Sequence, residues 1–410
     1  MAAPRSANVV RLGFVPLIDC ASLVVAREMG FADQRGLTLE LHKDMSWAAI
    51  RDKVTFGLYD GAHMLAGIPL ATRLGLGGVK ARMVAPMALG YGGNAVTVSK
   101  ALYERMAEAD PEAMAVQGAG TARALAKVIA ADRSRGADPY QFATVFPFST
   151  HNYELRYWLA SAGIDPDRDL NLGIVAPPRM ADALRSGWID GYCVGEPWNL
   201  RSVAGGAGRI VATKDDIWPT GPEKVLGLSE EWTLRNPDQT ARLVDALVDA
   251  AEWADDPSNA KTLAQLLART DYVDADEAII AQALSEKRYT FFRHGATYPW
   301  RAHGAWLLSQ MVRWGQITRG ADLLAVTEAV YRPDLYREAV ADSVDLPAEE
   351  PRMVGYNAIP YDIPGASGRA FAMAPDRFLD GRPFDREDPA GYAFQFQIGH
   401  PAVRRADLSG

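Results

Sequence analysis

Two stretches of the chain, around Asp60 and Asp190, repeat one order of elements. Each predicts a helix, a strand with an Asp-Gly turn, and the start of another helix: residues 47–54, 55–62 and 64–76 in the first, and residues 180–187, 188–195 and 196–198 in the second. Strands that alternate with helices form parallel sheets covered on both faces. The repeat therefore predicts two similar α/β lobes with helix starts at one shared edge, although Asp-Gly is a common turn dipeptide and chance is the alternative.

Two further β runs, residues 94–98 and 208–213, enclose the second stretch. This layout predicts one lobe inserted into the other, with the two runs as crossover strands and hinge. After Trp232 four helical patterns follow, which we expect to pack on the first lobe: residues 240–253, 260–267, 277–284 and 302–314. The predicted division is 8–98 for the first part of lobe 1, 99–211 for lobe 2, 212–346 for the second, largely helical part of lobe 1, and 347–410 for a C-terminal extension.

The C-terminal extension is rich in Pro, Gly and Asp but keeps aromatic residues at regular intervals: Phe371, Phe378, Phe384, Tyr392, Phe394 and Phe396. Aromatic side chains at such intervals favour a tail packed onto the body of the protein. A disordered tail is the alternative, because Pro and Gly are also typical of disorder.

Composition excludes several functions. The net charge of −8, without a local run of Lys and Arg, argues against direct binding of nucleic acid. No apolar run approaches the roughly 20 residues needed to cross a bilayer, and the first ten residues contain no apolar segment typical of a signal peptide. Cys20 and Cys193 form no redox or metal motif. We therefore expect a cytoplasmic protein with free thiols and no membrane contact.

Catalytic and nucleotide-binding motifs such as G-x-S-x-G, G-x-x-x-x-G-K-[ST] and H-E-x-x-H are absent. His151 with Glu154 could ligate a metal, but no third ligand has motif spacing. Two α/β lobes without a catalytic constellation predict a protein that captures a ligand between its lobes, with neither a metal nor another cofactor.

A predicted helix begins beside His151. Ser149 and Thr150 are residue types that cap helix starts, and Gly163 is typical of a helix end. The first turn of a helix has unpaired N–H groups and positive partial charge, so an imidazole there suits a small anion. A surface or capping histidine is the alternative reading.

The chain resembles a known family in five stretches: residues 13–21 (GFVPLIDCA), 59–64 (YDGAHM), 150–160 (THNYELRYWLA), 192–199 (YCVGEPWN) and 222–227 (PEKVLG). They resemble the nitrate-binding proteins of ABC transporters and, more closely, the cytoplasmic nitrate and nitrite sensors of the NasS type. The resemblance runs through most of the chain. It implies a two-lobed periplasmic-binding-protein fold of type II, with two crossover strands and a helical C-terminal portion on lobe 1.

By the same resemblance the ligand-binding positions are Gln117, His151, Gly195 and Lys224, and the position of an aromatic residue falls at Met64. Relatives that carry bicarbonate have an acidic residue at the lysine position, so Lys224 favours nitrate or nitrite. A planar monovalent anion needs several donors, which a lysine, an imidazole and an amide supply.

Secondary candidates for the site are His63 and Glu196. Each residue of the expected site also has an ordinary alternative. Lys224 is the type of residue usually found in solvent, Gln117 and Gly195 suit turns, and Met64 suits a core.

Three functions compete. The first is a sensor that closes around nitrate or nitrite and controls release of an RNA-binding antiterminator of the ANTAR type, a partner that only the resemblance implies. The second is the substrate-binding protein of a nitrate ABC transporter. The third is an enzyme with the same fold, like relatives in thiamine-pyrimidine synthesis. Its candidate reactive residues are His63 and Cys193. The absence of catalytic motifs argues against an enzyme.

Overall fold

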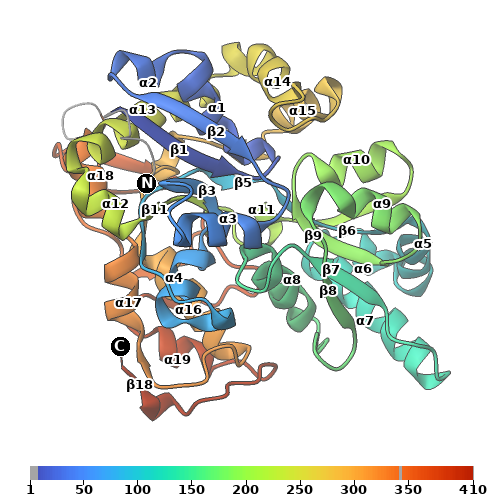
Figure 1. Ribbon diagram of the computed structural model, residues 1–410. Coiled ribbons are helices and arrows are strands. Elements are labelled where there is room, and N and C mark those ends of the chain that lie inside the picture. The colour runs from blue at the N-terminus through green and yellow to red at the C-terminus, as the bar shows by residue number, and fades with distance from the viewer. Residues whose placement is uncertain (1–7, 341–343, 410) are drawn as a thin grey trace.

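Each of two lobes is built on a five-stranded sheet. The computed structural model describes residues 8–340 and 344–409 and shows the lobes side by side (Figure 1). The first sheet has the order β2-β1-β3-β11-β4, with bounds Thr38–Lys43, Val9–Phe14, Gly61–Leu65, Lys224–Ser229 and Met83–Ala88. The second has the order β10-β6-β9-β7-β8, with bounds Gly208–Thr213, Asn94–Ser99, Gly191–Gly195, Gln141–Thr144 and Asn171–Ile174.

The two sheets share one topology. The central strand β3 pairs in parallel with β1 and antiparallel with β11, and β9 pairs in the same way with β7 and β6. A carboxylate just before each central strand accepts a backbone N–H from the parallel neighbour: Asp60 Oδ2 from Arg11 at 2.9 Å, and Asp190 Oδ2 from Gln141 at 2.8 Å. The predicted repeat is therefore confirmed, because the two Asp-Gly turns hold equivalent strands.

Around the first turn the predicted boundaries are wrong. The expected strand over residues 55–62 is a helix end and a turn, because α3 runs over Trp47–Thr55 and β3 begins only at Gly61. The helix expected from Met64 begins at Gly67 as α4 (Gly67–Leu74). Residues 63–65 are strand because β3 lies between β1 and β11 and forms backbone hydrogen bonds with its neighbours. Periodicity cannot tell whether such a short apolar run is strand or helix.

The two crossover runs are full members of the second sheet. β6 and β10 pair with each other antiparallel, and β6 also pairs with β9. The strands of the second sheet therefore lie between Asn94 and Thr213, so the predicted boundaries at 99 and 211 fall inside β6 and β10.

The helices divide between the lobes. Those of the second lobe are α5 (Lys100–Ala109), α6 (Pro111–Met114), α7 (Ala119–Ser134), α8 (Thr150–Ser161), α9 (Met180–Arg185) and α10 (Trp198–Ala204). The first lobe carries α1 (Ala21–Glu28), α2 (Phe31–Gln34), α3 and α4, and later α12 (Glu230–Arg235), α13 (Pro237–Asp255), α14 (Ala260–Ala268), α15 (Glu277–Ser285), α16 (Arg301–Arg313), α17 (Leu323–Val330) and α18 (Pro333–Val340). α13 packs on α1 and α18, while α16 and α17 pack on α4 (Figure 1).

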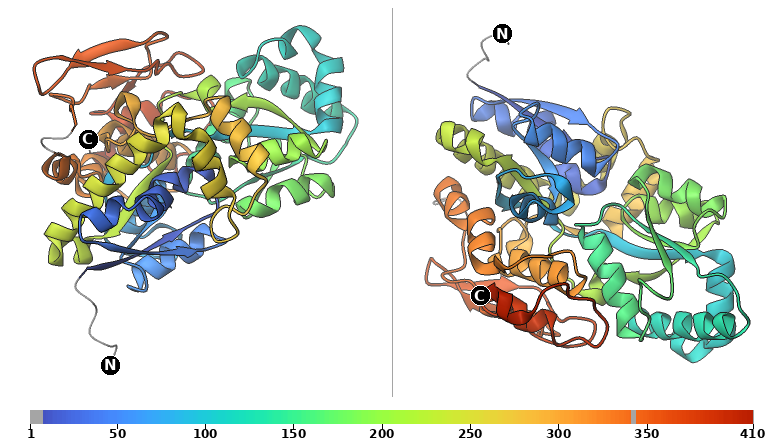
Figure 2. Two further views of the ribbon diagram at one scale, coloured as in Figure 1. Left: turned by 90° about the horizontal axis from the view of Figure 1, so that it is seen from above. Right: turned by 60° about the horizontal axis from the view of Figure 1, so that its bottom comes forward.

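The C-terminal extension lies along the body (red in Figure 2) and reaches both lobes. Its short helix α19 (Pro389–Ala393) packs on α16 of the first lobe. On the second lobe, Tyr157 of α8 donates a hydrogen bond to Asp380 Oδ1 at 2.8 Å, and its hydroxyl lies 3.0 Å from that of Tyr392. Phe378 is 2% exposed and packs against Tyr157 and Trp218. The extension is thus held by aromatic contacts of the kind its composition suggested.

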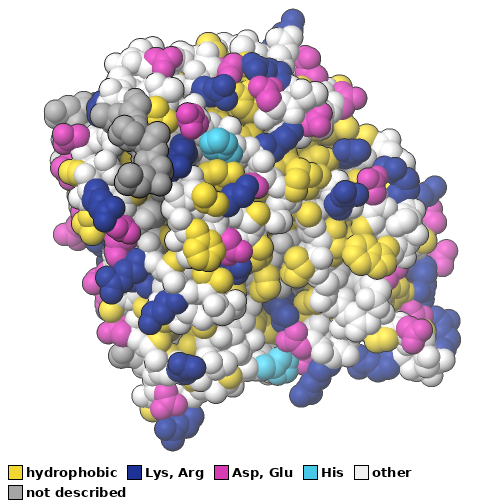
Figure 3. Space-filling model, in the orientation of Figure 1, with side chains coloured by type: hydrophobic (Ala, Val, Ile, Leu, Met, Phe, Trp, Pro, Cys, Tyr) yellow, Lys and Arg dark blue, Asp and Glu magenta, His cyan; other side chains and the backbone are white. Residues whose placement is uncertain are grey.

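Basic and acidic side chains are interspersed over the face shown in Figure 3, which agrees with the absence of a basic run in the sequence. Within the described ranges, no helix combines the length and the apolar character that crossing a membrane requires.

We expect Phe378→Ala to lower the free energy of unfolding by about 3–5 kcal/mol, because it empties a buried aromatic site. Its ring centroid lies 4.4 Å from that of Trp218 and 6.1 Å from that of Trp306. Phe394→Ala, in the same tail at a position 38% exposed, is the matched control and should change stability by less than about 1 kcal/mol. Denaturant titration followed by tryptophan fluorescence measures both, and equal small losses would contradict the packing of the tail.

Candidate functional site

Polar side chains from both lobes meet where the lobes touch. This central cluster consists of Asp19, His63, Asn94, Thr150, His151, Glu154, Lys214, Glu223 and Lys224, each 5% exposed or less. Asp19 follows β1, Lys224 begins β11, and His151 lies in the first turn of α8. Ser149 caps α8 by accepting the N–H of Asn152 at 3.1 Å, as its residue type predicts. The ends of separate elements thus bring their side chains to one point.

Lys224 is a buried ammonium held by two carboxylates. Its Nζ donates to Asp19 Oδ2 at 2.8 Å and to Glu223 Oε1. The other oxygen of Asp19 lies 2.7 Å from His63 Nε2. Burial opposes the charge of Lys224, yet the two carboxylates raise the pKa of this ammonium above its ordinary value. Burial alone would raise the pKa of Asp19, but Lys224 and His63 outweigh it and hold that pKa well below its usual range.

Glu223 joins the two lobes. Its Oε2 accepts a hydrogen bond from Thr150 Oγ1 at 2.7 Å and another from Asn94 Nδ2. Asn94 also donates to Glu154 Oε2 at 2.8 Å, and Glu154 in turn accepts from Lys214. Because Thr150 belongs to α8 and Asn94 to β6, whereas Glu223 precedes β11, the two bonds to Glu223 cross from one lobe to the other.

His151 is buried with both ring nitrogens lacking a hydrogen-bond partner among the described residues. Its Nε2 lies 3.7 Å from Glu223 Oε1, so one carboxylate oxygen faces both His151 and Lys224. Burial lowers the pKa of His151 to about 3, so near neutral pH the ring offers one N–H donor and one acceptor. An unpaired buried polar group costs about 1–3 kcal/mol, so this ring is a candidate donor for a ligand.

Gly195 leaves space beside His151. A Cβ atom on Gly195 would lie 3.7 Å from His151 Nε2 and 3.0 Å from Leu17 Cδ2, so a side chain there would press on Leu17 and narrow the approach to the imidazole. Gly195 ends β9 and pairs with Asn94 of the cluster. The structure therefore brings together three of the expected site residues: His151, Gly195 and Lys224.

His63 also belongs to the cluster, through Asp19, but Glu196 faces away from it. Glu196 Oε2 accepts the N–H of Leu200 at 3.0 Å, and its Oε1 lies 3.5 Å from Arg288 Nη1. Burial raises the pKa of Glu196 to about 7. The backbone of Glu196 does connect the lobes, since its carbonyl accepts the N–H of Ile18 at 3.1 Å.

Met64 and Gln117 lie away from the cluster. On the ladder between β3 and β11, His63 and Lys224 share one face and Met64 lies on the other, against Gly227, where an added Cβ would be 2.7 Å from Met64 Sδ. Gln117 is exposed in the turn before α7, and no hydrogen bond or ion pair joins it to the cluster within the described part of the chain. Their expected roles in binding stay predictions.

The aromatic side chain beside the cluster is Trp47 and not the residue at position 64. The sequence pattern identified Trp47 only as the start of a helix. Lys224 Nζ lies 5.5 Å from the centre of its ring, and the His63 ring centroid is 5.4 Å away. The indole Nε1 is buried without a partner among the described residues. Asp19, Thr150 and Glu223 were missed as well, although each stands next to or within one of the stretches that carried the resemblance.

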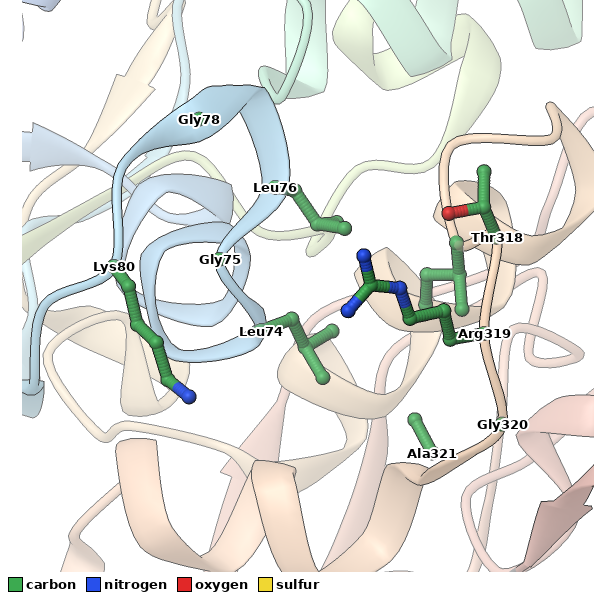
Figure 4. Close-up of a pocket in the computed structure, with 10 residues that line it drawn as sticks. Leu74, Gly75, Leu76, Gly78, Lys80, Thr318, Arg319, Gly320 and Ala321 are labelled. Carbon is green, nitrogen blue, oxygen red and sulfur yellow. The ribbon is translucent and has the colours of Figure 1, made fainter.

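A separate cavity of about 370 Å³ lies on the surface between the end of α4 and the loop after α16. Lys80 and Arg319 line it from opposite sides, and Arg319 extends toward Leu74 and Leu76 (Figure 4). Both cations are exposed, and no residue of the central cluster lines this cavity. This surface cavity is therefore separate from the buried donors of the central cluster.

Comparison with known proteins identifies relatives of this chain. Residues 3–268 match the NMT1-like family. The nitrate import ATP-binding protein NrtC of Synechocystis sp. strain PCC 6803 is 38% identical over 94% of this chain, which spans only 55% of the length of that relative. The nitrate/nitrite binding protein NrtA of Synechococcus elongatus strain PCC 7942 is 32% identical over 93% of this chain, which covers 85% of it.

The crystal structure of the periplasmic nitrate-binding protein NrtA from Synechocystis PCC 6803 superposes with a TM-score of 0.80 at 26% identity, over 95% of this chain and 99% of that one. The predicted two-lobed periplasmic-binding-protein fold is thereby confirmed. The relatives are binding and transport proteins by name. With its two equivalent sheets and a donor cluster between them, the chain belongs to the NMT1-like family, among the homologues of the nitrate-binding protein NrtA.

Proposed function

We propose that the protein binds nitrate or nitrite between its lobes, with Lys224 and His151 as donors and Gly195 as the position that admits the anion. The observation that carries this proposal is the ring of His151, which is buried without a hydrogen-bond partner and faces the same carboxylate oxygen as Lys224. The named ligands of the NrtA relatives support the choice of anion.

The chemistry of the cluster suits this ligand class. Nitrate is planar, carries one charge and accepts hydrogen bonds weakly, so a site must supply several donors and exclude water. A charge-assisted bond from Lys224 contributes about 1.5–3 kcal/mol, and the N–H of a neutral imidazole contributes about 1 kcal/mol. Trp47 adds an aromatic face and a buried N–H at the same place.

We further propose that the protein is a cytoplasmic sensor whose closure around the anion controls release of an antiterminator of the ANTAR type. The support is the resemblance to NasS-type sensors, together with the hydrogen bonds from Thr150 and Asn94 to Glu223, which cross between the lobes. Anion binding alters a partner's affinity only if the partner binds the open and closed arrangements unequally. The second candidate is the substrate-binding protein of a nitrate ABC transporter, which the names of the relatives favour.

For the binding site, we expect His151→Ala to weaken nitrate binding about tenfold, because it removes one buried N–H donor worth about 1 kcal/mol or more. The matched control is His303→Ala. His303 is also a buried histidine whose pKa burial lowers to about 3, but it packs against Trp218 outside the cluster. Isothermal titration with nitrate, nitrite and bicarbonate measures each variant, and equal affinities of the two variants would contradict the site.

For the sensor role, we expect the purified protein to hold its antiterminator in nitrate-free buffer and to release it when nitrate or nitrite is added. A sizing column run across a nitrate titration follows the complex, with His151→Ala shifting release to higher nitrate. A complex that persists unchanged at saturating nitrate would reject the sensor role while leaving anion binding in place. Cell fractionation separates the candidates, because a periplasmic pool would favour transport.

A further inference from the structure

The groups expected to bind the anion already face a carboxylate of the protein. Glu223 Oε1 contacts Lys224 Nζ and lies 3.7 Å from His151 Nε2. Its other oxygen is held by Thr150 and Asn94. An anion that reaches Lys224 and His151 must therefore approach Glu223 within a few ångströms, or push its carboxylate aside. Two negative groups this close in a buried site repel each other strongly.

The charges of the cluster make this repulsion costly. Three carboxylates, Asp19, Glu154 and Glu223, stand against two ammonium groups, Lys214 and Lys224. The two histidines, His63 and His151, add no charge near neutral pH, because burial lowers the pKa of both. A bound anion adds a negative charge to a buried cluster that has no excess positive charge, which is costly. Uptake of one proton would compensate the added negative charge.

Among the carboxylates, only Glu223 faces the two donors of the proposed site. Asp19 is turned toward His63 and Lys224, which hold it at 2.7 and 2.8 Å. Glu154 lies on the other side of Asn94, in contact with Lys214, and burial raises its pKa. Two further titratable groups near Glu223 keep their protons, because burial raises the pKa values of Cys193 and Tyr289 well above the ordinary range.

Resting on the anion site proposed above, we propose that Glu223 is its affinity-determining residue: each bound nitrate or nitrite is accompanied by one proton taken up on the Glu223 carboxylate. An ionised Glu223 only accepts hydrogen bonds and competes with the anion for Lys224. A protonated Glu223 releases Lys224 and offers an O–H donor toward the anion. The proton comes from solvent, and no bond other than the O–H bond of Glu223 is formed or broken.

The sign of the pH dependence follows from this scheme. Burial would raise the pKa of Glu223 in the free protein, but the ammonium groups of Lys224 and Lys214 outweigh it and lower that pKa. The neighbouring anion raises the pKa in the complex. Between these two pKa values the affinity for nitrate falls as pH rises, by up to about tenfold per pH unit for one proton. Below the lower pKa and above the higher one, affinity no longer depends on this group.

The test is isothermal titration of the full-length protein with sodium nitrate in buffers of different ionisation enthalpy, repeated from about pH 6 to pH 8. We expect uptake of about one proton per nitrate in the wild type and almost none in Glu223→Gln, whose affinity should stay constant over this range. Glu350→Gln is the control, since Glu350 is another buried carboxylate but accepts the N–H of Arg301 far from the cluster; it should behave like the wild type.

An infrared difference spectrum of the wild type provides a readout that needs no variant. Adding nitrate should replace one carboxylate band by one carboxylic acid band, and this holds even if Glu223→Gln fails to fold. Nitrate binding without proton uptake, or uptake that persists in Glu223→Gln, would overturn the role of Glu223 and leave the anion site standing. No binding of nitrate or nitrite by the wild type at any pH would overturn the site itself.

Discussion

The structure depends on an ammonium buried between two carboxylates at the meeting point of its lobes. Lys224 is 1% exposed and contacts Asp19 and Glu223, while Glu223 also receives a hydrogen bond from Thr150 of the other lobe. A buried ion pair of this kind adds little net stability, but removing one member leaves an unpaired charge that costs several kcal/mol. The pair therefore holds Glu223 within reach of Thr150 and Asn94 of the other lobe more than it strengthens the fold.

The repeated sheet explains why such a cluster forms at all. The equivalent central strands, β3 and β9, both contribute where the lobes meet, with His63 in the middle of β3 and Gly195 at the end of β9. Side chains carried by two different sheets thus meet where the two lobes are in contact. Small ligands of α/β proteins bind at such strand ends because loops and helix starts gather there.

The sequence was sufficient to predict the two lobes, most helices and the meeting of His151, Gly195 and Lys224, because capping residues, periodicity and family motifs are local signals. The resemblance assigned Met64 to the aromatic position of the ligand site, whereas the pleat of β3 turns the Met64 side chain to the face of the sheet opposite Lys224. Trp47 and Glu223 could not be found in this way, since their roles arise only from contacts between segments more than 100 residues apart in the chain: Trp47 meets Lys224, and Glu223 meets Asn94. The extent of β3 was missed for the same reason.

The C-terminal extension touches both halves of the molecule, with α19 on α16 and Asp380 on Tyr157 of α8. Two lobes linked only by β6 and β10 could swing apart freely about that hinge. Here a third mechanical connection spans the joint, so rotating α8 away from α16 must either carry the tail along or strip Phe378 from the rings of Tyr157 and Trp218. The tail thereby adds to the work of opening, beside the hydrogen bonds to Glu223 at the centre.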